Sequence, residues 1–203
     1  MKYLLIPFSW LYGFIIYCRN KAFDWKLLDS VEVGVPVISV GNLTMGGTGK
    51  TPLVEYIVKL CLAKGRKVAV VSRGYKRESG GVVVVSDGKS LLANAAQAGD
   101  EPVQIAKKFP GAIVIVGERR VDAARMAIDE FGVNAIVLDD GFQHRFLRRD
   151  LDILVLDARK DLSRIPMIPA GERREPLASI KRANVVAFSR TDAATAGNSW
   201  MKW

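Results

Sequence analysis

Residues 35–51 read VPVISVGNLTMGGTGKT, and this stretch decides the fold class of the chain. Its first six residues are mostly apolar and β-branched, which predicts a buried strand over 35–40. A glycine-rich turn follows, and a helical pattern over 51–64 begins where the turn ends. Glycines let successive backbone N–H groups turn inward, and the positive end of the next helix points at the same place. The order of strand, glycine loop and helix therefore predicts a binding site for an anion.

The turn contains the core of a Walker A phosphate loop, because its last six residues read GGTGKT. Lys50 is placed to reach the β- and γ-phosphates of ATP, and the Thr51 hydroxyl is placed to ligate Mg²⁺. The general pattern asks for glycine five residues before Gly49, where this chain has Thr44. The alternative is a glycine-rich turn that only caps a helix. The residues assigned to ATP are Thr44, Gly46, Gly47, Thr48, Gly49, Lys50 and Thr51.

Short apolar runs and helical patterns alternate from this loop to residue 189. Such alternation predicts an α/β fold of the P-loop NTPase type, a mostly parallel sheet with helices on both faces. The segment 78–90 is glycine-rich and polar, and we expect a hairpin excursion there. The expected strands are 35–40, 67–72, 82–86, 112–116, 135–139, 152–157 and 184–189. The expected helices are 51–64, 101–108 and 119–131.

Two pairs of acidic residues are candidates for metal and proton chemistry. Asp139 and Asp140 end the strand 135–139, at the sheet edge where α/β proteins bind ligands and where a P-loop protein needs acids for Mg²⁺. Asp100 and Glu101 precede a proline at a helix start. They either complement the dipole of that helix or supply a Mg²⁺ ligand and a base for a hydroxyl acceptor. The residues alone leave both interpretations open.

The chain is basic, with 30 Lys and Arg against 21 Asp and Glu and a net charge of +9. Basic clusters follow the expected strands at 72–77, 117–120 and 143–149, on the same rim as the phosphate loop. Arginine is well suited to phosphate, so this rim predicts an anionic partner. Nucleic acid is disfavoured, because no nucleic-acid-binding motif occurs and aromatic residues do not alternate with the basic clusters. The single histidine, His144, is expected to be structural rather than catalytic.

Residues 3–18 read YLLIPFSWLYGFIIYC and carry no formal charge. A spanning helix needs about 20 apolar residues, which this interrupted run does not have. No small-residue cleavage site follows, so a secretory signal is not expected. Its aromatic residues and flanking cations suit the surface of an anionic bilayer, and the alternative is a helix packed on the protein's own core. Cys18 and Cys61 lie in apolar runs and are expected to be reduced, buried thiols.

Six motifs together resemble the tetraacyldisaccharide 4'-kinases, the lipid A kinases of Gram-negative bacteria. They occur in that family's order over residues 1–190, and the phosphate loop with threonine at position 44 is one of them. They are VGNLTMGGTGKTP at 40–52, SRGY at 72–75, GDEP at 99–102, GERR at 117–120, LDDGFQHR at 138–145 and PAGERREP at 169–176.

The resemblance implies transfer of the γ-phosphate of ATP to the 4'-hydroxyl of a tetraacyldisaccharide 1-phosphate in lipopolysaccharide biosynthesis. It implies ATP and Mg²⁺, an acylated disaccharide lipid substrate, and an anionic membrane surface as a partner. The place would be the cytoplasmic face of the bacterial inner membrane, with peripheral or monotopic attachment. The apolar amino-terminal helix fits this picture, since an acylated acceptor stays in the bilayer.

The resemblance also implies roles for particular residues. Asp100 would be the base for the sugar hydroxyl, while Lys50 and Thr51 hold the phosphates and the metal. The implied catalytic residues are Asp100, Asp139, Asp140 and Lys50. The implied metal ligands are Thr51 and Glu101. The residues implied for the anionic substrate or the transferring phosphate are Tyr75, Arg120 and Arg174.

We expect three segments along the chain. They are a membrane-associating helix over 1–28, a P-loop kinase core over 29–190, and an atypical tail over 191–203 in place of the family's second lobe. A truncated copy of this kind is expected to keep ATP binding more readily than turnover. The competing hypotheses are a different membrane-associated P-loop ATPase and an inactive relative that binds nucleotide or lipid.

Overall fold

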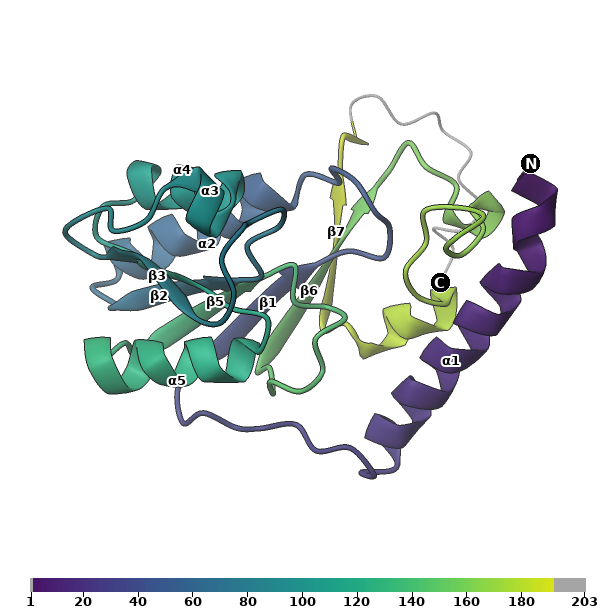
Figure 1. The fold of residues 1–203 in the computed structure, drawn as a ribbon, viewed down its shortest axis with the longest axis horizontal. Coiled ribbons are helices and arrows are strands. Elements are labelled where there is room, and N and C mark those ends of the chain that lie inside the picture. The colour runs from purple at the N-terminus through teal and green to yellow at the C-terminus, as the bar shows by residue number, and fades with distance from the viewer. Residues whose placement is uncertain (1, 192–203) are drawn as a thin grey trace.

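The computed structural model describes residues 2–191 and joins seven strands of this part into one sheet (Figure 1). The strand order is β3-β4-β2-β5-β1-β6-β7, and every neighbouring pair is parallel except β3 with β4. The strands are β1 (Val37–Gly41), β2 (Val68–Ser72), β3 (Val83–Asp87), β4 (Ile113–Val116), β5 (Ala135–Asp139), β6 (Leu151–Asp157) and β7 (Val185–Ser189). The predicted α/β fold with a mostly parallel sheet is confirmed.

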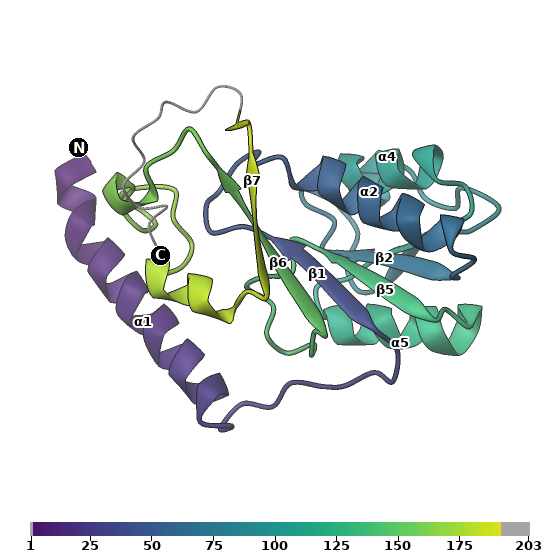
Figure 2. The same ribbon diagram turned by 180° about the vertical axis from the view of Figure 1, so that it is seen from behind.

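Helices cover both faces of the sheet (Figures 1 and 2). One face carries α2, α3 and α4, and the other carries α5, with a separate apolar core beneath each layer. The strands between them are apolar on both faces, as a sheet covered on both sides requires. The α-helices are α1 (Ile6–Asp24), α2 (Lys50–Ala63), α3 (Ala95–Ala98), α4 (Asp100–Lys108) and α5 (Arg120–Phe131). The 3₁₀ helices are η1 (Lys2–Leu5), η2 (Leu162–Arg164) and η3 (Leu177–Arg182).

One local expectation is confirmed only in part, and another is wrong. The segment 78–90 ends in a short hairpin turn, since Ser86 forms an antiparallel bridge with Leu91, but the longer pairing of β3 is antiparallel with β4, which follows only after α3 and α4. β3 is therefore an edge strand whose partner is distant in sequence, and a local pattern of glycine and polar residues does not specify that partner. Cys18 is exposed on α1 and Cys61 is half-buried, so the thiols are not both buried as expected.

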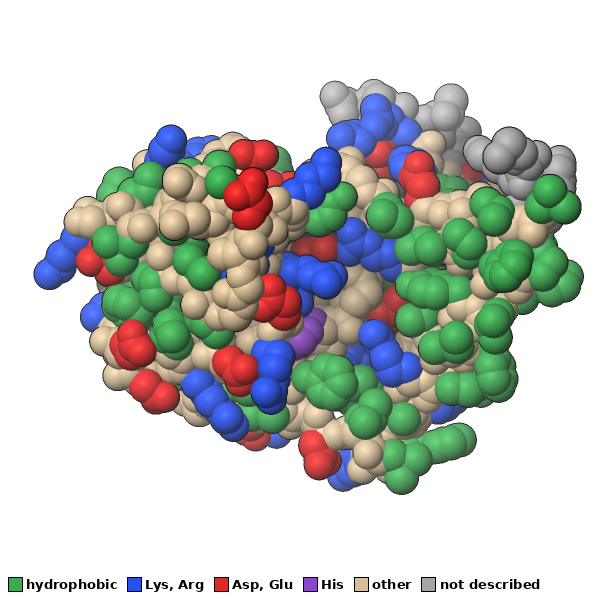
Figure 3. Space-filling model, viewed as in Figure 1, with side chains coloured by type: hydrophobic (Ala, Val, Ile, Leu, Met, Phe, Trp, Pro, Cys, Tyr) green, Lys and Arg blue, Asp and Glu red, His purple; other side chains and the backbone are tan. Residues whose placement is uncertain are grey.

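Helix α1 lies outside the sheet, along the segment 160–182 (Figures 1 and 2). Its buried residues include polar ones such as Ser9 and Asn20, whereas Trp10 is 73% exposed. Figure 3 shows apolar side chains gathered on this side of the molecule. The large apolar residues exposed on this helix are Phe8, Trp10, Leu11, Phe14, Ile15 and Tyr17. Within residues 2–191, no helix is both long and apolar enough to cross a bilayer.

Candidate active site

The phosphate loop joins the carboxyl end of β1 to the start of α2. Gly49, at the N-cap of α2, has a left-handed backbone with φ of +77°. A Cβ at this position would lie 3.2 Å from the Cβ of Ser189, so both the conformation and the space favour glycine. The Ser189 hydroxyl donates a 2.7 Å hydrogen bond to the carbonyl of Thr48. The end of β7 therefore supports the loop just before the helix begins.

The buried side chain of Asn42 stabilises the conformation of the phosphate loop. The side-chain amide of Asn42 donates to the Thr48 hydroxyl at 2.8 Å, and both residues are buried. The side chain of Gln143 donates to the Asn42 carbonyl at 2.7 Å. Thr48 was predicted as a nucleotide contact, and its side chain forms a hydrogen bond within the loop. Asn42 and Gln143 lie within the quoted motifs, but their part in holding the loop was not predicted.

The loop is also paired with the segment that carries Arg174. The Arg174 amide donates to the Leu43 carbonyl at 2.7 Å, and the Met45 amide donates to the Glu172 carbonyl at 2.7 Å. Thr44 lies between them in an antiparallel bridge with Arg173. Its φ is not positive, so this position does not need the glycine of the general pattern. The departure at position 44 therefore has a structural reason.

A chain of three charges crosses the site beside the loop. The Lys50 ammonium lies 3.4 Å from Oδ1 of Asp140, and Nη1 of Arg174 donates to Oδ2 of Asp140 at 2.7 Å. Burial opposes ionisation of Asp140, but the charges of Lys50 and Arg174 outweigh it and lower the pKa of this carboxyl. The predicted residues Lys50, Asp140 and Arg174, from three distant parts of the sequence, are brought together here.

Asp139 ends β5 and lies fully enclosed next to this chain of charges. Burial, together with the charges of Asp140 and Glu101, raises the pKa of Asp139 to about 7, and the charge of Lys50 opposes them. Acidic groups crowded in this way are a donor set that suits a hard divalent cation. In residues 2–191 no three His, Cys, Asp or Glu side chains form a cage for a metal. Mg²⁺ at phosphate sites usually takes only one or two carboxylates and fills the rest with phosphate and water oxygens, so the residues fit Mg²⁺.

The GDEP turn begins α4 and packs on the loop after β2. Gly99 has φ of +90°, and a Cβ there would lie 2.8 Å from the Tyr75 carbonyl oxygen. Asp100 and Glu101 are exposed in the first turn of α4, where they complement the helix dipole. The charge of Glu101 also acts on Asp139, so Glu101 lies near the acids at the end of β5. The placement fits the dipole interpretation, and the roles as metal ligand and base stay predictions.

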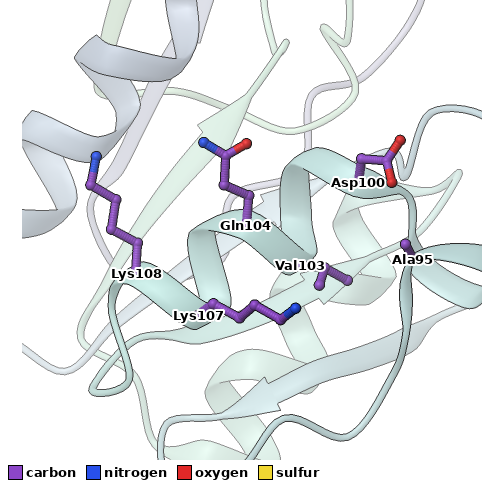
Figure 4. A pocket seen from close by; sticks show the side chains of 6 residues that line it. All are labelled: Ala95, Asp100, Val103, Gln104, Lys107 and Lys108. Carbon is purple, nitrogen blue, oxygen red and sulfur yellow. The ribbon is translucent and has the colours of Figure 1, made fainter.

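Figure 4 shows a hollow beside α4, and Asp100 is one of the residues that line it. The side chains of Asp100, Gln104 and Lys108 project from the same side of the helix. The residues that line this hollow are Ala95, Asp100, Val103, Gln104, Lys107 and Lys108. The Asp100 carboxylate is therefore open to solvent beside this hollow.

Basic residues surround the other side of Asp140. Arg120 begins α5 and is buried, and burial together with the charge of Arg73 lowers the pKa of Arg120 to about 10. Burial and the charges of Arg120 and Arg149 lower the pKa of His144 to about 4, so this imidazole is neutral at pH 7. Its Nε2 has no hydrogen-bond partner within the described part of the chain. Figure 3 shows basic side chains around a hollow at the centre of this face.

Tyr75 is the substrate candidate that stands apart from the charge chain. Its side chain is 69% exposed, and the Lys76 ammonium lies 5.5 Å from the centre of its ring. Among the described residues, no hydrogen bond or ring contact joins it to the phosphate loop. Its place on the rim leaves it free to meet a ligand from outside.

The order of β1, glycine loop and α2, with two acids at the end of neighbouring β5, defines a P-loop nucleotide-binding protein. The family model for Tetraacyldisaccharide-1-P 4'-kinase matches residues 1–202. The chain belongs to this family.

Curated relatives carry the same description. A tetraacyldisaccharide 4'-kinase of Chlorobaculum parvum is 46% identical over 199 residues, which are 96% of this chain and 55% of that protein. One from an Anaeromyxobacter species (strain Fw109-5) is 47% identical over 176 residues, 87% of this chain and 47% of that protein. The chain therefore spans about half the length of the curated relatives it matches.

A solved structure gives the same result. The crystal structure of the "apo" form of LpxK from Aquifex aeolicus in complex with ATP superposes with a TM-score of 0.88 at 43% identity. The match covers 95% of this chain and 60% of that one.

Proposed function

We propose that this chain binds ATP and Mg²⁺ and transfers the γ-phosphate to the 4'-hydroxyl of a tetraacyldisaccharide 1-phosphate. The observation that carries the proposal is the chain of charges Lys50, Asp140 and Arg174 beside the phosphate loop. Phosphoryl transfer depends mainly on positioning and charge neutralisation, and this arrangement supplies two cations and an acid at one place. ATP bound to the related LpxK supports the assignment of the nucleotide.

The phosphates would bind to the backbone N–H groups of 46–51 and to Lys50. Lys50 would exchange its ion pair with Asp140 for the β- and γ-phosphates. Arg174 also pairs with Asp140, and it would be available to the transferring phosphate. Before nucleotide binds, the charges of Lys50 and Arg174 lower the pKa of Asp140, so this acid is ionised in the site that ATP would enter.

Thr51, Glu101 and Asp139 would hold the Mg²⁺ ion. When bound, Mg²⁺ neutralises charge on the phosphates. A nearby cation favours the ionised carboxylate, so the raised pKa of Asp139 would fall as the metal enters.

Asp100 would accept the proton of the 4'-hydroxyl, since its carboxylate is exposed at the start of α4. Arg120 and Tyr75 would contact the anionic acceptor. The neutral His144 beside Arg120 has an Nε2 that can accept or donate one further hydrogen bond there.

Helix α1 would rest on the membrane that holds the acylated acceptor. Its outward aromatic and aliphatic residues match the interface of a bilayer. A hollow next to it is lined by apolar Ile6 and Ile165 and by two ion pairs, Lys160 with Glu172 and Arg164 with Asp161. The place would be the cytoplasmic face of the bacterial inner membrane. In this proposal 1–28 is the membrane helix and 29–190 the kinase core. Residues 192–203 of the expected tail 191–203 lie outside the described residues.

The experiment is transfer from γ-labelled ATP with Mg²⁺ to a tetraacyldisaccharide 1-phosphate in mixed detergent micelles. The proposal is supported if the unmodified chain and Lys59→Ala both transfer phosphate and Lys50→Ala does not. Lys59 is the matched control because it is an exposed lysine on the same helix. ATP hydrolysis without transfer would favour another P-loop ATPase. ATP binding without either reaction would favour an inactive nucleotide-binding relative.

A further inference from the structure

A fully buried carboxylate lies one residue beyond Arg174. The side chain of Glu175 is 0% exposed. Its Oε2 accepts from Nη1 of Arg182 at 2.9 Å and from the side-chain amide of Asn20 at 3.1 Å. Its Oε1 accepts from Nη2 of Arg182 at 3.2 Å, and the Arg19 guanidinium lies 3.8 Å away. A buried carboxylate with this many donors is held in a single orientation.

The partners of Glu175 come from separate parts of the fold. Asn20 and Arg19 belong to α1, and Arg182 ends η3. Arg182 also donates to the Phe142 carbonyl at 3.2 Å, and its guanidinium carbon lies 4.4 Å from the centre of the Phe142 ring. Glu175 therefore joins α1 and η3 to the turn that follows Asp140.

The residue before Glu175 is the one that reaches the phosphate site. Arg174 pairs with Asp140 through its side chain and with the Leu43 carbonyl through its amide. Its own carbonyl accepts a 3.1 Å hydrogen bond from the Tyr12 hydroxyl of α1. The backbone of 174–175 is thus fixed from α1 on one side and joined to the phosphate loop on the other.

We propose that Glu175 is a positioning residue that holds Arg174 against Asp140 and ties the seating of α1 to the geometry of the phosphate loop. Glu175 acts through Arg174 and has no contact with the reacting groups of its own. The kinetic part of this inference rests on the proposed function, and the structural part does not. Because α1 would lie on the lipid surface, its contact with Glu175 gives the membrane side of the protein a direct connection to the site.

The structural part is tested by amide hydrogen exchange in Glu175→Gln. A glutamine keeps the shape but turns an NH₂ group toward the donors of Arg182 and Asn20. Exchange of the Arg174 and Met45 amides, which bond across to the loop, should rise by about tenfold or more. The matched control is Glu172→Gln, since Glu172 lies in the same segment and its exposed carboxylate pairs with Lys160. Equal protection in both variants would overturn the inference.

If Glu175→Gln does not fold into a state that unfolds cooperatively, Asn20→Ala provides a second variant. It keeps the pair of Glu175 with Arg182 and removes the side-chain bonds of Asn20 to Glu175 and Ser179. The two amides should again exchange faster, by a smaller factor. Unchanged exchange in Asn20→Ala would contradict the connection to α1.

The kinetic part is a double-mutant cycle with Arg174→Ala in the transfer assay. Glu175→Gln should lower kcat by about 10- to 100-fold in the otherwise unchanged chain and by less than about twofold when Arg174 is already alanine. If Glu175→Gln lowers kcat by the same factor with and without Arg174, Glu175 acts through the general stability of the fold. That result would overturn the positioning role. Absence of transfer in the unmodified chain would refute the proposed function, and the exchange measurement would then decide this inference alone.

Discussion

Lys50 and Asp140 form an ion pair across the phosphate site, with the ammonium 3.4 Å from the carboxylate. They come from neighbouring strands of the sheet, because Lys50 follows β1 and Asp140 follows β5. Arg174 takes the other oxygen of Asp140 at 2.7 Å. The position of the lysine is thus set by an acid that is itself held by an arginine from a third segment.

This ion pair leads to a prediction for Asp140→Asn. Loss of the negative charge removes a competitor for Lys50, so the Kd for ATP without Mg²⁺ should improve by about two- to fivefold, as expected for a partly exposed ion pair. Transfer should fall by about 10²-fold or more, because Arg174 loses the carboxylate that holds it beside the phosphate loop. Weaker binding of Mg²⁺-free ATP by this variant, measured by calorimetry, would show that Asp140 does not compete for the lysine.

Asp100→Ala should separate binding from chemistry. ATP affinity should stay within about twofold of the unmodified chain, while transfer should fall by about 10²- to 10⁴-fold through loss of a general base. Gln104→Ala is the control, since Gln104 projects from the same side of α4 (Figure 4). A similar loss of transfer in both variants would mean that any change on this side of α4 impairs transfer. Asp100 would then not be the general base.

Two titratable groups, one buried and one half-buried, give the metal-free chain opposing pH dependences. Asp139 has its pKa raised to about 7, so the folded chain binds more protons than the unfolded chain between about pH 4 and 7, and its stability falls as pH rises. His144 has its pKa lowered to about 4, so the unfolded chain binds more protons up to about pH 6.5, and stability rises with pH. Each contribution is limited to about 1.4 kcal/mol per pH unit.

The test is urea unfolding at a series of pH values from 4.5 to 6.5 with a chelator present. Asp139→Asn should make the free energy of unfolding rise more steeply with pH than in the unmodified chain. His144→Gln should make it fall. Parallel pH profiles for all three proteins would contradict the buried titrations.

Binding to lipid should depend on the outer face of α1. Phe14→Asp should weaken binding to vesicles that contain an anionic phospholipid by about tenfold or more, because one exposed aromatic no longer enters the interface. Higher salt should weaken binding further by screening the basic surface. Tyr56→Asp is the control, as Tyr56 is 63% exposed on α2. If both variants bind vesicles equally in a sedimentation assay, α1 does not contact the membrane.

Most of the sheet could be predicted from the sequence because its signals are local. A covered parallel strand is a short apolar run, so strands such as β2 and β5 were predicted to within a residue at each end. The phosphate loop and the acids at the end of β5 were found for the same reason, since each is one short motif. The predicted grouping of Lys50, Asp140 and Arg174 followed from the family resemblance.

Features that depend on distant partners were not predicted. The pairing of β3 with β4 is set by the chain between them, and Glu175 meets Asn20 across 155 positions. In the sequence Glu175 is only an acid between arginine and proline. Cys18 was expected to be buried because its neighbours are apolar, yet α1 turns its apolar face outward, and a local pattern does not say which way such a face points.

The central claim is that Lys50 belongs to a site for ATP phosphates, and the most direct test is a calorimetric titration of the chain with ATP and Mg²⁺. The unmodified chain and Lys59→Ala should bind with the same Kd. Lys50→Ala should bind about 30-fold or more weakly, as expected when one partner of a charged hydrogen-bonded contact is removed. Unchanged affinity in Lys50→Ala would contradict the site.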